Sequence, residues 1–379
     1  MDIMLQPSKL RGAVTAPPSK SIAHRMLICA AFAAKPTTLL CADTNQDIEA
    51  TTDCLRALGA DIQRTDTGYT ILPIQRIPES ADLYCHESGS TLRFLLPIVG
   101  ALGVTTTFHM EGRLPQRPLS PLWEEMERTG CNLSRPTADT IRCQGKLRPG
   151  AYKIDSSISS QFVSGLLLAL PLIDGETSLE ITGKQASRPY IEMTLRTIEY
   201  FRNDHSELVL VEGDWSNGAF WLAANALGSD LTVTNLDVAS VQGDREILNL
   251  LPKLRQNCCI SAADIPDLVP ILSVVAAANH GAVFTDIARL RLKESDRMAS
   301  TIAMLESLGG RAEATEDTLT VYGTGLTGGT VDSFGDHRIA MSAAIAATVC
   351  KEPVTILGAE CVQKSYPKFR EEYRRLTTM

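Results

Sequence analysis

Several stretches of the chain are apolar on almost every side of the helix that they predict. The segments 160–172, 217–227, 267–278 and 339–349 consist largely of small and aliphatic residues, with few charged positions to form a polar face. A helix without a polar face is buried in a core. Because segments typical of strands lie between these helices, the pattern predicts an α/β protein with helices inside and sheets around them.

A second pattern recurs along the chain. The stretches 55–71, 126–143 and 305–321 each read as a helix end, a glycine, a strand, a polar turn and a second strand. Glycine after a helix suits the left-handed backbone that often ends one. Regular recurrence predicts one supersecondary unit used several times. Weaker echoes near residues 202 and 256 lack much of the strand pair, so we expect a fourth and a fifth copy to be clipped.

Length and composition narrow the class of protein. With 379 residues, 44% of them hydrophobic and 21% charged, the chain is expected to form two globular domains. A net charge of −8 argues against general nucleic-acid binding. The ten cysteines form no CxxC pair, which predicts reduced thiols and a cytoplasmic location rather than a zinc framework. No apolar run approaches the roughly 20 residues of a membrane span.

Cations stand at the start of several predicted helices, where positive charge is unfavourable. The clearest cases are Lys20, Lys293, Arg297 and Arg338. Each polar start taken singly could be an ordinary cap. Helix N-termini present free N–H groups that bind anions, so a bound anion explains why cations gather there. Together these starts predict an anion-binding site in an acidic protein.

Ten motifs, in order from "PPSKSIAHR" to "KSYPKF", span residues 17–369 and resemble those of the 5-enolpyruvylshikimate-3-phosphate synthase family. Between them lie "ESGSTLRF", "GRLPQRPLSPL", "SRPYIEMT", "RLKESDR" and "DHRIAMSAA", among others. The resemblance implies two domains, 16–213 and 1–15 with 214–379. Each would be an inside-out α/β barrel of three βαβαββ units, with the active site in the cleft between the domains.

The resemblance also implies a reaction. The carboxyvinyl group of phosphoenolpyruvate is transferred to the 5-hydroxyl of shikimate 3-phosphate, and phosphate is released. Carbon C3 of phosphoenolpyruvate gains a proton while the hydroxyl attacks C2, so an acid and a base are needed. No cofactor or metal is implied, because cationic side chains stabilise the anionic groups. The expected partners are these two small substrates, without nucleic acid or membrane, and the expected state is a monomer.

The resemblance assigns roles motif by motif. The residues implied for shikimate 3-phosphate are Lys20, Ser21, Arg25, Ser159, Ser160, Gln161, Ser187, Tyr190, Asp267 and Lys293. Those implied for phosphoenolpyruvate are Lys20, Gly89, Arg113, Gln161, Arg297, Arg338 and Lys364. Asp267 is the implied base at the 5-hydroxyl, whereas the C3 proton and the leaving phosphate are left to Glu294, Lys20 and Lys364. Asp336 and His337 are expected to orient Arg338.

Two positions depart from the family pattern. Glu87 stands where the family usually has Asn and adds negative charge near the expected anion site. Arg289 stands where an Asn that contacts shikimate is frequent, and would be an additional phosphate ligand.

Two alternatives remain at this point. The related transferase that acts on UDP-N-acetylglucosamine uses a Cys five residues before the Arg-Pro of its loop. Here that position is Gly112 and the loop has no Cys. A noncatalytic anion-binding relative would explain the cations, but it would have no need for the acids Asp267 and Glu294.

Overall fold

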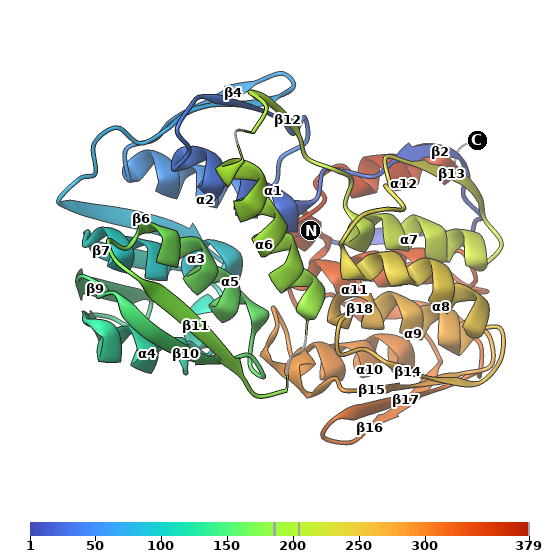
Figure 1. Cartoon of the computed structure of the whole chain (residues 1–379). Coiled ribbons are helices and arrows are strands. Elements are labelled where there is room, and N and C mark those ends of the chain that lie inside the picture. The colour runs from blue at the N-terminus through green and yellow to red at the C-terminus, as the bar shows by residue number, and fades with distance from the viewer. Residues whose placement is uncertain (185–186, 204, 378–379) are drawn as a thin grey trace. The chain divides into compact units, whose positions relative to one another are not determined.

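The computed structural model of the chain divides into two units, and the chain passes between them twice. One unit comprises Met1–Pro17 and Gly213–Met379, and the other comprises Pro18–Glu212 (Figure 1). The structure describes residues 1–184, 187–203 and 205–377. Both units mix helices and strands, which confirms the α/β class.

The central unit, Pro18–Glu212, holds six α-helices and ten strands among its described residues. The helices are α1 (Lys20–Ala31), α2 (Gln46–Ala57), α3 (Gly89–Leu102), α4 (Leu122–Thr129), α5 (Ser160–Ala169) and α6 (Arg188–Arg202). The strands are β3 (Thr37–Leu40), β4 (Asp61–Thr65), β5 (Gly68–Leu72), β6 (Ser80–His86), β7 (Thr105–Met110), β8 (Cys131–Ser134), β9 (Thr140–Gly145), β10 (Gly150–Asp155), β11 (Thr177–Thr182) and β12 (Leu208–Leu210). Short 3-10 turns are η1 (Leu114–Gln116) and η2 (Leu170–Leu172).

The terminal unit is built from both ends of the chain. Its helices are α7 (Trp215–Ala226), α8 (Ile247–Lys253), α9 (Val269–Ala278), α10 (Arg297–Ser307), α11 (His337–Ala346) and α12 (Phe369–Thr377). Its strands are β1 (Ile3–Leu5), β2 (Arg11–Thr15), β13 (Asp230–Thr234), β14 (Cys258–Ser261), β15 (Ala282–Thr285), β16 (Arg311–Ala314), β17 (Thr318–Tyr322), β18 (Gly329–Asp332) and β19 (Val354–Leu357). Its 3-10 turns are η3 (Gly243–Glu246), η4 (Pro266–Leu268), η5 (Ala288–Leu292) and η6 (Ala359–Lys364).

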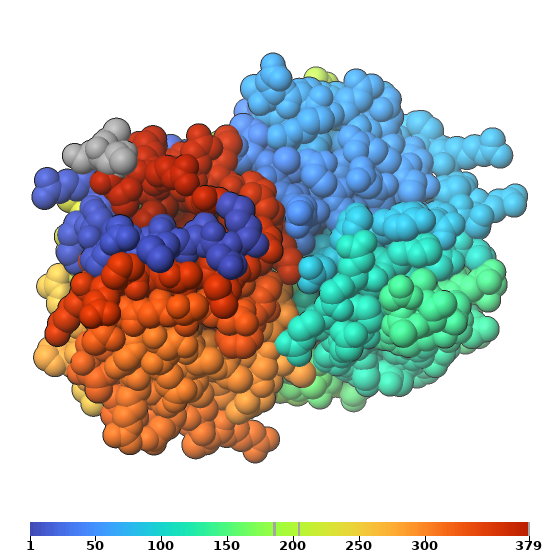
Figure 2. All heavy atoms as spheres, turned by 180° about the vertical axis from the view of Figure 1, so that it is seen from behind, coloured from blue at the N-terminus to red at the C-terminus, as the bar shows by residue number. Residues whose placement is uncertain are grey.

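Pairing of β1 with β19 and of β2 with β13 ties the N-terminal residues into the terminal unit. Figure 2 shows the N-terminal segment, in dark blue, lying across C-terminal segments in red.

One sheet pattern recurs three times. The sheets β12-β3-β5-β4, β6-β7-β9-β8 and β14-β15-β17-β16 each have one parallel pair followed by two antiparallel pairs. The last two strands of each sheet are the predicted hairpin. Gly59, Gly130 and Gly309, which follow the helices, have φ of 106°, 127° and 80°, a region that disfavours side chains. The three full repeats are therefore confirmed.

The two clipped copies also have a structural counterpart. Among the described residues, α6 is followed by the single strand β12, and α8 is followed by the single strand β14. The sheets β10-β11 and β13-β2 accordingly contain two parallel strands each. Loss of the hairpins leaves β11 and β13 as edge strands.

The helices expected to be apolar all round are buried. Every residue of α11 and nine of the ten residues of α9 are buried, as are most residues of α5 and α7. In the terminal unit they form a core with Trp215, Trp221 and Phe369. Within the described part of the chain, no helix is both long enough and apolar enough to cross a membrane.

Candidate active site

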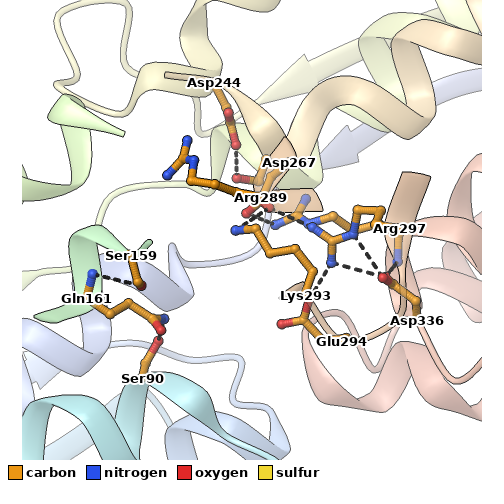
Figure 3. A network of polar contacts seen from close by, with 12 residues as sticks. Ser90, Ser159, Gln161, Asp244, Asp267, Arg289, Lys293, Glu294, Arg297 and Asp336 are labelled. Atoms are coloured by element: carbon orange, nitrogen blue, oxygen red, sulfur yellow. Dashed lines mark hydrogen bonds and ion pairs between the residues drawn. The ribbon is translucent and has the colours of Figure 1, made fainter. Parts of the chain in front are cut away.

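Carboxylates and cations meet in the terminal unit, where η4, α10 and α11 begin (Figure 3). We call this group the acid–base cluster; its members are Asp267, Lys293, Glu294, Arg297, Asp336 and Arg338. Four of them lie within two residues of the first residue of a helix or turn. The sequence analysis named these cations and the carboxylates Asp267, Glu294 and Asp336, and the structure shows how they pair.

Arg297 lies at the centre of the acid–base cluster and is 1% exposed. Its Nε is 2.9 Å from Oδ2 of Asp336, and its Nη1 is 2.8 Å from Oδ1 of Asp267. Its Nη2 also donates to Oε2 of Glu294. Burial opposes the charge on Arg297, but the carboxylates of Asp336, Glu294 and Asp267 raise its pKa above the ordinary value. The guanidinium therefore stays charged and holds three acids together.

Asp267 has cations on both carboxylate oxygens. Its Oδ1 lies 2.8 Å from Arg297 Nη1 and 3.6 Å from Lys293 Nζ, and its Oδ2 accepts from Arg338 Nη2 at 2.9 Å. Burial alone would raise the pKa of Asp267, but Arg338, Lys293 and Arg297 hold that pKa well below the usual 3.8. In this state the carboxylate is ionised and is a weak base.

Asp336 explains why a buried helix begins with charged residues. It is the N-cap of α11, it is fully buried, and its Oδ1 accepts from the Arg338 backbone N–H at 2.9 Å. Its Oδ2 also accepts from the hydroxyl of Ser295 at 3.1 Å. One carboxylate thus caps α11 through the Arg338 backbone N–H and holds the guanidinium of Arg297 on α10, while orientation of the Arg338 side chain by Asp336 stays a prediction.

Lys293 has an altered acidity. Burial lowers the pKa of its ammonium to about 8, although the neighbouring Asp267 opposes that shift. A lysine with this pKa can exchange a proton near neutral pH.

Asp244, in η3, is a further buried acid that the sequence analysis missed. It is 2% exposed, and its Oδ2 accepts from the hydroxyl of Ser216. Burial, together with the negative charge of Asp267, raises the pKa of Asp244 to about 7. No local pattern marks this residue, because η3 is far from η4 and α11 in the sequence.

Two further predicted residues of the terminal unit bind backbone carbonyls. Arg289 donates from Nη2 to the Ala263 carbonyl at 2.7 Å. Lys364 donates from Nζ to the Gly335 carbonyl at 3.0 Å, which brings it beside the loop that leads into α11.

In the central unit, Lys20 is the first residue of α1 and forms an ion pair with Asp47 of α2. The distance from Nζ to Oδ2 is 2.8 Å, and both side chains are 15% exposed. Asp47 lies in the first turn of its helix, where a carboxylate is favourable. The sequence analysis did not single out Asp47.

Arg25 is buried more deeply than its predicted binding role suggests. It is 2% exposed, and it donates to the Thr194 and Ser164 hydroxyls and to the Tyr190 carbonyl, at 2.7, 3.2 and 2.9 Å. Burial lowers its pKa to about 10. Arg25 therefore joins α1 to α5 and α6, and so fixes the start of α6.

Gln161 connects the starts of α5 and α3. Its backbone N–H donates to the hydroxyl of Ser159, the N-cap of α5, at 3.2 Å (Figure 3). Its side-chain amide donates to Ser90 at 3.0 Å and accepts from Arg93 Nη1 at 2.7 Å. Ser160, the first residue of α5, is buried beside this contact.

Gly89 begins α3 where two arginines converge. A methyl group at this position would lie 2.7 Å from Arg117 Nη1 and 3.3 Å from Arg93 Nη1. Arg117 is a half-buried side chain of the Pro-rich loop, whereas Arg113 in the same loop is exposed. A methyl group at Gly112 of this loop would collide with the carboxylate of Glu87, so Glu87 lies against the loop that carries Arg113.

Ser187 and Tyr190 lie at the start of α6. Ser187 is the N-cap, is 3% exposed, and has a φ of 58°, which is uncommon for residues other than glycine. The Tyr190 N–H donates to the Ser187 carbonyl at 3.0 Å. Ser21 is the second residue of α1, and its carbonyl accepts from Arg25.

Within each unit, most of the predicted residues therefore lie at helix starts. In the described part of the chain, no group of three or more His, Cys, Asp or Glu is arranged to hold a metal ion.

Comparison with known proteins gives these residues a family context. The model of the family described as EPSP synthase (3-phosphoshikimate 1-carboxyvinyltransferase) matches residues 4–262 and 255–373. A 3-phosphoshikimate 1-carboxyvinyltransferase of Clostridium kluyveri is 36% identical over 412 residues, covering 99% of this chain and 97% of the relative. Another from Clostridium perfringens strain SM101 is 37% identical over 416 residues, covering 99% and 98%.

A solved structure agrees in fold. The EPSP synthase of Acinetobacter baumannii superposes with a TM-score of 0.80 at 24% identity, covering 99% of this chain and 98% of that chain.

Proposed function

The chain belongs to the EPSP synthase family, whose reaction transfers the carboxyvinyl group of phosphoenolpyruvate to shikimate 3-phosphate, and we propose that the helix-start residues of its two units carry out that reaction. The acceptor is the 5-hydroxyl, and the products are 5-enolpyruvylshikimate 3-phosphate and phosphate. This is a transferase reaction of the shikimate pathway, which leads to chorismate and the aromatic amino acids. Both units contribute residues to it.

We further propose that each unit is an inside-out α/β barrel of three βαβαββ repeats. The recurring strand order and the buried apolar helices support this architecture. In this interpretation the hairpins missing after α6 and α8 belong to the outer layer. Their loss leaves the helix starts that carry the chemistry in place.

The observation that carries the proposed chemistry is the position of Asp267 among Arg338, Arg297 and Lys293. These cations are the proposed partners of the substrates' phosphate and carboxylate groups, so bound substrate competes with Asp267 for them. As they turn toward substrate, the pKa of Asp267 rises from its depressed value. The carboxylate then becomes strong enough to take the proton of the 5-hydroxyl as that oxygen attacks C2.

A second proton moves to C3 of phosphoenolpyruvate, which gives a tetrahedral ketal phosphate, and a C3 proton is removed again as phosphate leaves and the C2–C3 double bond re-forms. Glu294, Lys20 and Lys364 are the candidate donors, and the same groups would assist the leaving phosphate. Lys293 and Arg25 would hold shikimate 3-phosphate together with Ser21, Ser159, Ser160, Ser187 and Tyr190. Gly89, Arg113, Gln161, Arg297 and Arg338 would hold phosphoenolpyruvate, in which the arginines stabilise the charge that develops on the phosphate.

We also propose that the protein is a cytoplasmic monomer. All ten cysteines are free thiols and most are buried, as in proteins kept in a reducing compartment. Sedimentation velocity of the intact chain tests the monomer, since the molar mass derived for a dimer would be twice that of the chain.

The test of the function is phosphate release from phosphoenolpyruvate and shikimate 3-phosphate by the purified chain, followed with a coupled assay. We expect release that requires both substrates, and a loss of about a hundredfold or more in Asp267→Asn and in Lys20→Ala. Glu306→Gln, an exposed acid on α10, is the matched control and should keep full activity. No release by the folded wild-type chain would contradict the function. Full activity of both variants would contradict only the assigned roles.

A further inference from the structure

A buried chain of hydrogen bonds joins the first three helices of the central unit. Nδ1 of His24 on α1 is 2.7 Å from the hydroxyl of Thr51 on α2, which is 2.7 Å from the hydroxyl of Thr91 on α3. Thr91 in turn donates to the hydroxyl of Ser88, the N-cap of α3, at 2.7 Å. All four side chains have zero exposure. The proposed reaction uses none of them.

The hydrogen bonds from His24 to Ser88 all run in the same direction. Thr91 has a single hydroxyl proton, for which Ser88 at 2.7 Å is a closer acceptor than the Asp47 carbonyl at 3.5 Å. With either acceptor, Thr91 accepts from Thr51, and Thr51 accepts from His24 Nδ1–H. Burial and the nearby charges of Lys20 and Arg25 hold the pKa of His24 well below its usual range, so the ring is neutral. Its Nε2 is then a lone pair, and within the described residues it has no hydrogen-bond partner.

The His24–Thr51 hydrogen bond is a second link between α1 and α2, beside the Lys20–Asp47 ion pair. Lys20 precedes His24 by four residues on α1, and Asp47 precedes Thr51 by four residues on α2. Residues four apart lie on the same face of a helix. The Lys20–Asp47 ion pair at the helix starts and the His24–Thr51 hydrogen bond one turn further along therefore join the same faces of α1 and α2.

We propose that His24 and Thr51 are positioning residues that hold Lys20 and the start of α3, including Gly89, in their reactive arrangement. This inference rests on the proposed function, in which Lys20 and Gly89 contact phosphoenolpyruvate. Loss of the Thr51 hydroxyl leaves the buried His24 Nδ1–H without its acceptor and removes the donor to Thr91. These hydrogen bonds then no longer set the spacing of α1, α2 and α3. A shift of about 1 Å in a group that contacts substrate is enough to slow a reaction about a hundredfold.

The experiment compares three variants of the full chain. Thr51→Val keeps the shape of the side chain and removes the hydroxyl, whereas Thr51→Ser keeps the hydroxyl. Thr52→Val is the matched control, because Thr52 is equally buried on the same helix and its hydroxyl donates to the Ile48 carbonyl of that helix at 2.9 Å. Steady-state kinetics with phosphoenolpyruvate, calorimetric binding of shikimate 3-phosphate and urea unfolding are measured for each.

In Thr51→Val we expect kcat/KM for phosphoenolpyruvate to fall about 10- to 100-fold. Binding of shikimate 3-phosphate should weaken less, because Arg25, another of its proposed ligands on α1, is held by α5 and α6. Thr51→Ser should recover to within about threefold, and Thr52→Val should keep wild-type kinetics even where it is equally destabilised. Wild-type kinetics in Thr51→Val, no rescue by Ser, or an equal loss in Thr52→Val would overturn the proposal.

Two readouts do not depend on catalysis. Nitrogen NMR of the wild-type chain should show His24 as a neutral ring protonated on Nδ1, and a ring protonated on Nε2 would overturn the proposed direction. The rate of reductive methylation at Lys20, followed by mass spectrometry, should rise in Thr51→Val and not in Thr52→Val. If the wild-type chain released no phosphate, the proposed function would fail, but these two measurements would still test whether His24 and Thr51 hold Lys20 in place.

Discussion

Arg338, which is buried, and Asp267, whose side chain is 16% exposed, form an ion pair of 2.9 Å between different helix starts of the terminal unit. Each belongs to a different part of the proposed chemistry, since Arg338 would bind phosphoenolpyruvate and Asp267 would accept a proton. In the proposed reaction, the pair would therefore keep Asp267 ionised but weakly basic until a substrate anion takes its cation. Substrate charge and the basicity of Asp267 would then be coupled through this contact.

Arg338→Gln should move the acid limb of the pH–rate profile. Loss of the guanidinium removes a cation that depresses the pKa of Asp267, so that pKa rises by about one unit or more. Because the base must be ionised, kcat/KM at low pH should fall more than at neutral pH. Phosphate release is measured from pH 7.5 down to about pH 3, because the depressed pKa of Asp267 places the wild-type acid limb below the usual 3.8. An acid limb that stays at its wild-type position would argue against Asp267 as the base.

The matched control for this profile is Arg311→Gln. Arg311 is exposed on β16, where it is paired with Glu313 and lies over the Tyr322 ring, so its loss changes surface contacts away from the acid–base cluster. The acid limb of this variant should superpose on that of wild type.

Asp244→Asn should stabilise the protein at alkaline pH more than at acid pH. The folded-state pKa of Asp244 is raised to about 7, so the folded protein holds a proton that the unfolded chain releases near pH 4. Stability is therefore lost as pH rises through this interval, and an uncharged Asn escapes the loss. Urea unfolding should give a benefit about 2 kcal/mol larger at pH 8 than at pH 5. A benefit that does not change with pH would contradict the raised pKa.

The helix starts were predictable because caps and apolar faces are local patterns. Asp336 directly precedes a helix that is largely apolar after its first two residues, and Arg338 stands where a cation is unfavourable, so these neighbouring residues predict an anion-binding site. The three hairpins were equally visible, since a glycine and two short strands follow each helix. Predicting these hairpins needed no information about contacts between distant parts of the sequence.

The partners of these residues were not predictable. Lys20 gives no sign of its ion pair with Asp47, and Asp267 gives none of its proximity to Asp244, because each pair comes from elements that only the fold brings together. Arg25 was assigned to a substrate, but its burial among Thr194, Ser164 and Tyr190 depends on how α1 packs on α5 and α6. Local sequence carries the charge of a side chain, whereas tertiary packing decides its partner.

Arg297→Met should destabilise the terminal unit by about 3 kcal/mol at neutral pH, because it leaves the buried Asp336 without its closest cation. Without Arg297, burial raises the pKa of Asp336 above its unfolded value, so the loss should be smaller at pH 5 than at pH 8. Urea unfolding at the two pH values measures both effects. Arg311→Met, at an exposed pair, should cost less than about 1 kcal/mol. A loss that is equal at both pH values would show that packing, not charge, explains it.

Gly89→Ala should weaken phosphoenolpyruvate binding without unfolding the central unit. A methyl group at this position would lie 2.7 Å from Arg117 Nη1, so the guanidinium must move, and because it ends a flexible side chain it can do so cheaply. The backbone of Gly89 needs no left-handed conformation, so Ala adds no strain there. We expect KM for phosphoenolpyruvate to rise about tenfold and KM for shikimate 3-phosphate to change less than about twofold.

The family resemblance implies that glyphosate occupies the phosphoenolpyruvate site, so inhibition by glyphosate is a sharper measurement of the space at Gly89. In the wild-type chain the absence of a methyl group leaves Arg117 and Arg93 against the start of α3, so glyphosate should inhibit competitively with phosphoenolpyruvate. In Gly89→Ala the same displacement of Arg117 should raise the inhibition constant by at least about tenfold, in parallel with KM. Arg117→Lys in the Gly89→Ala background separates displacement of residue 117 from direct crowding of the inhibitor by the methyl group, because the shorter Lys leaves room for that methyl group. Glyphosate sensitivity that is unchanged in Gly89→Ala would place the inhibitor away from this helix start.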